Sequence, residues 1–168
     1  MMFKEAYGLK ITVFRPFNVY GSRQRSDQYG GVIASFIQRL RMRKVPVIYG
    51  DGKQTRDFIH VNDVVRSFLS ALNHDGAADR VFNVAFGVPV TINQLARLVI
   101  KLYGADGVKP QHLDAREGEI RHSYADIREA VKHLGFKPVV SLTEGLLALI
   151  RRLESGKILG KILYGKRD

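Results

Sequence analysis

The feature that most restricts the fold is an alternation of short apolar runs with longer amphipathic stretches along the chain. Apolar runs predict strands near residues 10–15, 45–49, 58–61 and 80–85. Stretches with helical periodicity predict helices over 31–44, 62–72, 91–103, 126–135 and 141–156. Strands that alternate with helices are typical of an α/β fold, which is therefore the fold class that the sequence predicts.

Capping and turn residues set the limits of these helices. Thr91 with Gln94 and Ser141 with Glu144 have the spacing of capping boxes, and Asp126 with Glu129 is interpreted as a helix start in the same way. Glycines at 104, 135 and 156 are expected near helix ends. The helix capped by Asn62 or Asp63 is expected to turn five apolar side chains toward the core, namely Val64, Val65, Phe68, Leu69 and Leu72.

Length and composition exclude several classes of protein. The 168 residues, 45% of them hydrophobic, are typical of one globular domain, and no run of apolar residues is long enough for a membrane span. The N-terminal residues lack the apolar core of a signal peptide, so a cytoplasmic location is expected. The absence of cysteine excludes disulfides and thiolate metal sites, and the histidines have no metal-binding spacing, so we assign no metal site.

The net charge of +11 is the unusual compositional feature, and it leaves two interpretations open. Basic residues crowd the end of the helix over 31–44 and the C-terminal tail, residues 156–168; the first group is Arg39, Arg41, Arg43 and Lys44. Such clusters are compatible with a nucleic-acid-binding or protein-interaction module. Cations in the last turn of a helix also oppose its dipole, and we favour this solvated helix face, which makes nucleic acid an unlikely partner.

Three stretches in order carry a family resemblance: RPFNVYGSRQ at 15–24, GDGKQTRDFIHVNDVV at 50–65 and YADIREAVKHLGFKPVVSLTEGL at 124–146. They resemble extended short-chain dehydrogenase/reductases, the NAD-dependent nucleotide-sugar epimerase/dehydratase family, and are most similar to the UDP-glucose 4-epimerase group. Phe58 and Asp57 fit the epimerase branch, because dehydratases commonly have Trp and decarboxylases commonly have Ser at these positions.

The resemblance covers only the C-terminal half of such an enzyme. It implies a Rossmann remnant over 1–30 with the last Rossmann strand and an active-site loop, a mixed α/β nucleotide-sugar-binding domain over 31–155, and a basic tail over 156–168. The Gly-rich dinucleotide fingerprint of the family is absent, and no predicted helix holds its Tyr-x-x-x-Lys pair, since Tyr7 and Lys10 stand only three positions apart. We therefore assign no catalytic residue, and we expect no turnover and no bound NAD without the missing half.

Family motifs that match this sequence imply the site residues. In the complete enzyme a hydride passes from C4 of the sugar to NAD and returns, and Phe17 matches a position near the nicotinamide. Positions that match substrate contacts are Asn18, Gly31, Val32, Val47, Tyr49, Arg56, Arg116 and Glu119. In the family the two arginines bind the diphosphate, residues at 47 and 49 flank uracil, and an acidic residue at 119 binds the ribose diol. A planar guanidinium suits a diphosphate because it can bond two oxygens at once.

Each assignment has a structural alternative. Arg56 could pair with Asp57 or Asp63, and Arg116 could pair with Asp114 or Glu117. Tyr49 could be an ordinary strand aromatic, Asn18 a turn residue, and Phe17 a core residue. Without a Rossmann half, the strand edge at residues 10–15 and the neighbouring apolar faces are expected to be exposed. Exposed edges and apolar patches favour association, so we expect a homo-oligomer, or association with a separate N-terminal half.

Overall fold

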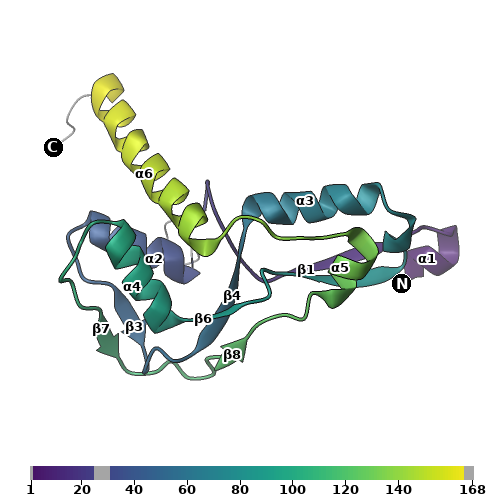
Figure 1. The fold of residues 1–168 in the computed structure, drawn as a ribbon, viewed down its shortest axis with the longest axis horizontal. Helices are drawn as coiled ribbons and strands as arrows, with labels where there is room; N and C mark the ends of the chain where they lie inside the picture. Colours follow the sequence, from purple (N-terminus) through teal and green to yellow (C-terminus); the bar gives the residue numbers. More distant parts are fainter. Residues whose placement is uncertain (1, 25–30, 165–168) are drawn as a thin grey trace. The chain divides into compact units, whose positions relative to one another are not determined.

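The computed structural model describes the backbone of residues 2–24 and 31–164, and the side chains of residues 3–24 and 31–155. Its elements in chain order are α1 (Met2–Tyr7), β1 (Thr12–Pro16), β2 (Asn18–Tyr20), α2 (Gly31–Arg41), β3 (Val47–Tyr49), β4 (Thr55–His60), α3 (Val61–Leu72), the 3-10 helix η1 (Asp75–Ala77), β5 (Arg80–Val84), β6 (Pro89–Thr91), α4 (Ile92–Leu102), β7 (Gln111–Leu113), β8 (His122–Ser123), α5 (Arg128–Leu134) and α6 (Leu142–Tyr164) (Figure 1). The β1–β5, β2–β4, β3–β7 and β4–β8 pairs are all parallel. The predicted α/β class is confirmed.

The chain divides into two compact units, and each is assembled from three separate segments. The first unit comprises residues 1–20, 55–90 and 121–140, and the second comprises residues 21–54, 91–120 and 141–168. The division of function expected at residues 30 and 155 stays a prediction.

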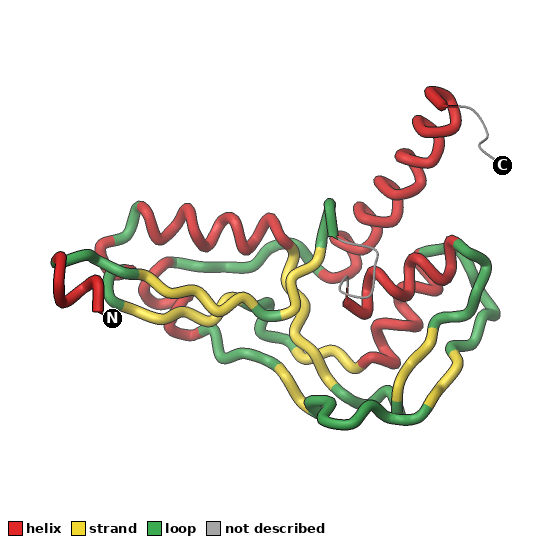
Figure 2. The backbone as a smooth tube through the Cα atoms, turned by 180° about the vertical axis from the view of Figure 1, so that it is seen from behind, coloured by secondary structure: helices red, strands yellow, loops and turns green. Residues whose placement is uncertain are grey.

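The first unit contains a two-stranded parallel pair, β1 with β5, in which Phe14 lies opposite Phe82 (Figure 2). Alternate side chains of a strand point to opposite faces, so Phe14, Phe82 and Val84 share one face. This face packs against α3 and α5, and the buried core also includes Ile59, Val64, Ala77, Ala130, Leu134 and Phe136. The other face carries Val13 opposite Val81, which are 41% and 42% exposed.

A second sheet of this unit has the strand order β2–β4–β6, and β8 also pairs with β4. Asn18 lies opposite Phe58 and Tyr20 lies opposite His60. The interpretation of residues 18–20 as part of a loop was therefore wrong. Pro16 lacks an amide hydrogen, and the chain leaves β1 there to join the neighbouring sheet.

The second unit packs three helices together beside the parallel pair β3–β7. Helix α4 contacts both α2 and α6, through apolar positions three and four residues apart. The buried side chains are Ile33, Phe36, Ile37 and Leu40 of α2, Ile92, Leu95, Ala96, Val99 and Ile100 of α4, and Leu146, Leu149 and Ile150 of α6. The predicted capping box is confirmed at α4, where Gln94 N donates to Thr91 Oγ1 and Thr91 N donates to Gln94 Oε1.

Helix α3 differs from the prediction in its cap and in its orientation. His60, rather than Asn62 or Asp63, is the N-cap, and its Nδ1 accepts from Asn62 N at 3.3 Å. Of the five apolar side chains expected in the core, only Val64 is buried. Val65, Phe68, Leu69 and Leu72 are 47–81% exposed, because the buried side of the helix is formed by Asp63, Val64 and Ser67.

The last two helices correct the predicted boundaries. Helix α5 begins at Arg128 with Ile127 as N-cap, and the Asp126 carboxylate accepts from both the backbone N and the side chain of Arg128. Its predicted end at Gly135 is confirmed, with φ at 59°. Helix α6 continues through Gly156 to Tyr164; an interior glycine costs only about 1 kcal/mol and does not by itself end a helix.

Candidate functional site

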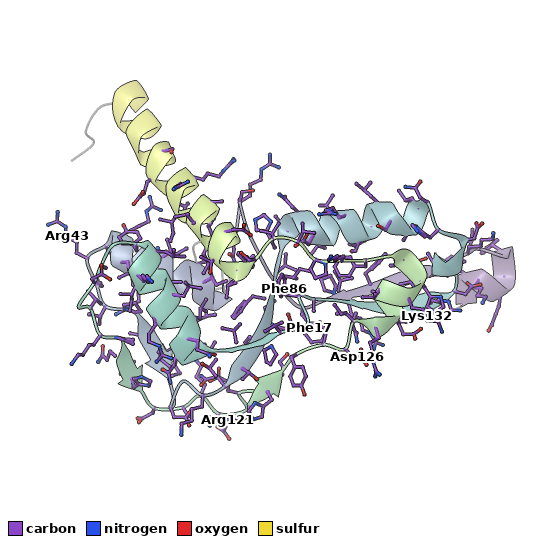
Figure 3. All side chains as sticks on the ribbon, viewed as in Figure 1. Phe17, Arg43, Phe86, Arg121, Asp126 and Lys132 are labelled. Carbon is purple, nitrogen blue, oxygen red and sulfur yellow. The ribbon has the colours of Figure 1, made fainter. Side chains whose placement is uncertain are left out.

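The predicted site residues fall into both units, with Phe17, Asn18 and Arg56 in the first and the other six in the second. Phe17 follows β1, and its backbone N donates to Val84 O at the end of β5 at 2.9 Å. Figure 3 labels Phe17 and Phe86, which follow the carboxyl ends of these two parallel strands. Carboxyl ends of parallel strands are where ligands bind in open α/β sheets.

Asn18 is held at the start of β2 by a neighbouring strand. Its Nδ2 donates to the backbone oxygen of Asp57 at 2.9 Å, and its side chain is half-buried. One amide hydrogen is used in this bond, whereas the amide has two hydrogens and an acceptor oxygen. Asn18 therefore presents further hydrogen-bonding capacity from a fixed position.

Arg56 lies half-buried on β4, and its guanidinium donates to the backbone oxygen of Thr55 at 2.8 Å. It does not pair with either carboxylate that the sequence offered. Asp57 accepts from the backbone N–H groups of Phe86, Gly87 and Ala125, and Asp63 accepts from Val139 and Val140. The structural alternative for Arg56 was therefore wrong.

The two carboxylates of this segment are both fully buried. Burial raises the pKa of the Asp57 carboxyl above its ordinary value, and the N–H bonds from Ala125, Phe86 and Gly87 oppose that rise. Such N–H bonds favour the ionised form of a carboxyl, whereas burial disfavours it. Asp57 and Asp63 are structural partners of the backbone, which the sequence analysis did not identify.

Tyr49 and Arg116 come together in the second unit. The guanidinium carbon of Arg116 lies 3.8 Å from the centroid of the Tyr49 ring, within the range of a cation–π contact. Arg116 has no ion pair with Asp114 or Glu117, so the alternative of a surface pair was wrong. Tyr49 is half-buried on β3, and Val47 lies two residues earlier on the same face of that strand.

Glu119 is joined to Arg116 by a tight turn. The backbone N of Glu119 donates to Arg116 O at 3.3 Å, and Gly118 has a φ of 73°, which only glycine adopts readily. Gln54 fixes this turn to the end of β3, because its Nε2 donates to Tyr49 O at 2.8 Å and lies 3.5 Å from Glu119 Oε1. The buried Gln54 amide thus links Tyr49 to Glu119, and Arg116 joins them through its ring contact with Tyr49 and its backbone bond with Glu119.

The turn after β3 brings the backbone at Gly52 close to the Asn93 side chain. A Cβ at Gly52 would overlap the Asn93 side chain, whose Nδ2 donates to Asp51 O at 2.8 Å. The His112 ring nitrogen Nδ1 lies 2.7 Å from Gly50 O, which ties the turn to β7. These contacts hold the strand that carries Val47 and Tyr49.

Gly31 and Val32 begin α2, with Gly31 exposed and Val32 half-buried. The first N–H groups of a helix lack partners within the helix and carry its positive dipole end, as the predicted anion contact requires. Residues 25–30, which precede them, lie outside the described residues.

The basic cluster at the end of α2 is not uniformly solvated. Arg43 and Lys44 are exposed, and Figure 3 shows Arg43 projecting outward, but Arg39 and Arg41 are half-buried. The Arg39 Nε donates to Val45 O at 2.6 Å. A single solvated face is therefore wrong for this cluster, because two of its arginines pack along the protein.

Two features bear on other classes of site. Among the described residues there is no group of three or more His, Asp or Glu side chains arranged to hold a metal ion. No helix within the described part of the chain combines the length and the apolar character needed to cross a membrane.

The sequence analysis did not identify Gln54 and Asp57 as residues whose hydrogen bonds hold neighbouring segments in place. Both lie in the segment GDGKQTRDFIHV that carries the family resemblance, between the predicted strands. A carboxylate and an amide next to buried apolar residues are a signal of buried hydrogen bonding, since polar side chains in a core are nearly always bonded.

Comparisons with known proteins identify the family of the chain. The model of the NAD dependent epimerase/dehydratase family matches residues 2–85, half of the chain. The chain belongs to this family.

A curated relative, the UDP-glucose 4-epimerase of Mycolicibacterium smegmatis, is 36% identical over 145 residues, which are 86% of this chain and 46% of that protein. The crystal structure of a UDP-glucose 4-epimerase with UDP-glucose from Thermotoga maritima has a TM-score of 0.87 and 38% identity, covering 93% of this chain and 50% of that one.

A UDP-glucuronic acid 4-epimerase from Bacillus cereus, in complex with UDP-glucuronic acid and NAD, has a TM-score of 0.82 and 28% identity. It covers 92% of this chain and 48% of that one. The chain thus spans about half the length of the relatives that it matches.

Proposed function

We propose that this chain is the nucleotide-sugar-binding portion of an NAD-dependent epimerase that acts on UDP-sugars. The stacked pair of Tyr49 and Arg116 supports this most directly, because it combines an aromatic surface and a fixed cation within one small segment of the second unit. A nucleoside diphosphate has both features to match, a planar base and two charged phosphates.

The other residues of the second unit fit parts of the same ligand. Glu119, in the turn with Arg116, supplies a carboxylate acceptor for ribose hydroxyls. Val47, two residues before Tyr49, supplies an apolar flank for the base, and the N-terminus of α2 at Gly31 and Val32 suits an anion. For the first unit, the family resemblance supports Asn18 and Arg56 as nucleotide-sugar contacts.

NAD does not fit the residues present as a complete site. Phe17 is half-buried at the end of β1 and offers an apolar ring beside a nicotinamide. The chain has neither the Gly-rich loop that holds a pyrophosphate nor an acidic residue assigned to the cofactor ribose. We therefore propose that NAD belongs to the complete family enzyme and that this chain alone does not retain it.

The exposed apolar surface of the first unit supports a protein partner. Val13 and Val81 form an outward pair on β1 and β5, and α3 has four exposed apolar side chains at helical spacing. Large exposed apolar patches mark interaction surfaces. We propose that they contact a separate N-terminal Rossmann half or, without it, another copy of the chain, and that both act in the cytoplasm.

Calorimetric titration of the purified chain tests the binding proposal, with UDP, uridine and GDP as ligands. UDP should bind and raise the melting temperature, since ligand at about 100 times its Kd adds roughly 2.7 kcal/mol of stability. Uridine, which lacks the diphosphate, should bind far more weakly, and GDP should be weaker because its base is larger. Equal binding of UDP and GDP, or no response to millimolar UDP, would contradict the proposal.

A further inference from the structure

Asp57 lies next to both predicted ligand-binding side chains of the first unit, those of Asn18 and Arg56. Its carboxylate accepts the backbone N–H groups of Phe86 at 2.9 Å, Gly87 at 3.0 Å and Ala125 at 3.3 Å. Its backbone oxygen accepts from Asn18 Nδ2 at 2.9 Å. One residue therefore joins β2, β4, the turn after β5 and the segment after β8.

The burial of the Asp57 carboxylate in the core costs free energy. Asp57 is fully buried, and none of its bonds within the described residues comes from a cationic side chain. Burial of an ionised carboxylate without a cation is costly unless hydrogen bonds compensate for lost hydration. An apolar side chain of similar volume would avoid that cost. Filling the core therefore does not by itself explain why Asp57 and its hydrogen bonds occupy this position.

Arg56 and Asp57 are consecutive on β4, and consecutive side chains of a strand point to opposite faces. Anchoring the Asp57 carboxylate on the inner side therefore fixes the position at which the Arg56 side chain leaves the strand. The Arg56 guanidinium also bonds Thr55 O at 2.8 Å, which holds it close to the same strand. A cation fixed before binding loses less freedom when the ligand arrives.

We propose that Asp57 is a positioning residue that sets Asn18 and Arg56 for binding of a nucleoside diphosphate. The inference rests on the proposed function. Asp57 acts through these two side chains and does not touch the ligand itself.

Asp63 provides a matched control. It is also fully buried in the first unit, and its carboxylate accepts the backbone N–H groups of Val139 at 3.2 Å and Val140 at 3.0 Å. It differs in having Arg66 at 3.8 Å and in bonding a segment that carries no predicted ligand contact. Asp57→Asn and Asp63→Asn should therefore both lower the melting temperature.

UDP affinity separates the two variants. We expect Asp57→Asn to raise the Kd for UDP about tenfold, because misplacing Arg56 weakens a charge-assisted bond, and Asp63→Asn to change it less than about twofold. In the Asn18→Ala, Arg56→Ala background, Asp57→Asn should add less than about twofold, since the groups through which it acts are gone. Equal effects of the two Asn variants, or an undiminished effect in that background, would overturn the inference.

Amide hydrogen exchange of the unaltered chain gives an answer even where Asp57→Asn does not fold. Saturating UDP should slow exchange at the amides of Phe86, Gly87 and Ala125 and leave those of Val139 and Val140 unchanged. UDP binding without this difference would overturn the positioning role alone. Failure of the unaltered chain to bind UDP would instead overturn the proposed function, and the inference with it.

Discussion

The guanidinium carbon of Arg116 lies 3.8 Å from the centre of the Tyr49 ring, although the two residues are 67 positions apart in the chain. The parallel pairing of β3 with β7 brings Leu113 opposite Tyr49, so that Arg116 follows only three residues later. A cation held on an aromatic face is already ordered, which under the proposed function would prepare it for a phosphate.

Removal of either predicted phosphate-binding arginine should weaken UDP binding strongly. Each charge-assisted bond is worth about 1.5–3 kcal/mol, so Arg56→Ala and Arg116→Ala should each raise the Kd by roughly 10- to 150-fold in calorimetric titrations. Asn18→Ala, which loses a neutral donor, should cost about 1 kcal/mol. Arg43→Ala is the control, since Arg43 projects outward, and a larger effect there would favour the alternative of a basic interaction module.

Substitution of Tyr49 separates stacking from hydrogen bonding. Tyr49→Phe keeps the aromatic face under Arg116 and should leave the Kd for UDP nearly unchanged. Tyr49→Leu removes that face and should cost about 0.5–1 kcal/mol, the value of an exposed cation–π contact. Equal losses with Phe and with Leu would indicate that the hydroxyl, and not the ring, matters.

The chain alone should self-associate through its exposed apolar surface. Leu72 is 81% exposed and Leu69 54% exposed on α3, and Leu72→Glu should shift sedimentation toward monomer because it puts a charge on that surface. Gln38→Glu adds the same charge at an exposed position of α2 and should have no effect. A clean monomer of the unaltered chain at high concentration would argue against the surface.

The Asp126–Arg128 pair predicts an acid-dependent signal. The hydrogen bonds from the Arg128 side chain and backbone lower the pKa of Asp126 to about 2 from its ordinary 3.8. The ionised form thus favours the folded state above about pH 4, and this contribution is lost as the pH falls through about 2. Carboxyl NMR titration should show the low pKa, and Arg128→Ala should raise it toward 3.8. The effect on stability should be small, because both side chains are exposed.

Enzyme assays of the purified chain should give no epimerase turnover. The dinucleotide fingerprint is absent from its sequence, and its one Tyr-x-x-x-Lys spacing, Tyr49 to Lys53, lies at the end of β3 and in the loop after it, not on a helix. Conversion of UDP-galactose to UDP-glucose, followed by a coupled assay, should stay at the level of a blank. Turnover that persists through purification and is lost in Arg116→Ala would contradict this expectation.

The sequence predicted the elements better than it predicted their surroundings. Thr91 with Gln94 and Gly135 marked helix limits correctly because caps depend on neighbouring residues. The apolar spacing of α3 predicted its amphipathic face but not that this face is exposed, since periodicity carries no information about which surface covers it. His60 as N-cap was missed because its ring accepts a bond only in the local geometry after β4.

For the candidate site too, the sequence predicted residues but not the contacts that they make with distant segments. Arg116 was identified from the family motif, but its stacking on Tyr49 depends on strand pairing between distant segments. Asp57 was considered as a partner for Arg56 and as a marker of the epimerase branch. Its actual partners are backbone groups near residues 86 and 125, which no local pattern reveals.

The polypeptide passes from one compact unit to the other five times, after residues 20, 54, 90, 120 and 140. A single cut anywhere in the chain therefore cannot release either unit whole. A truncation that removes more than the first 20 residues, or that extends from the C-terminus past residue 141, takes segments from both units. Recombination between relatives should preserve folding only when it exchanges matched sets of three segments, so that each unit receives all of its pieces from one parent.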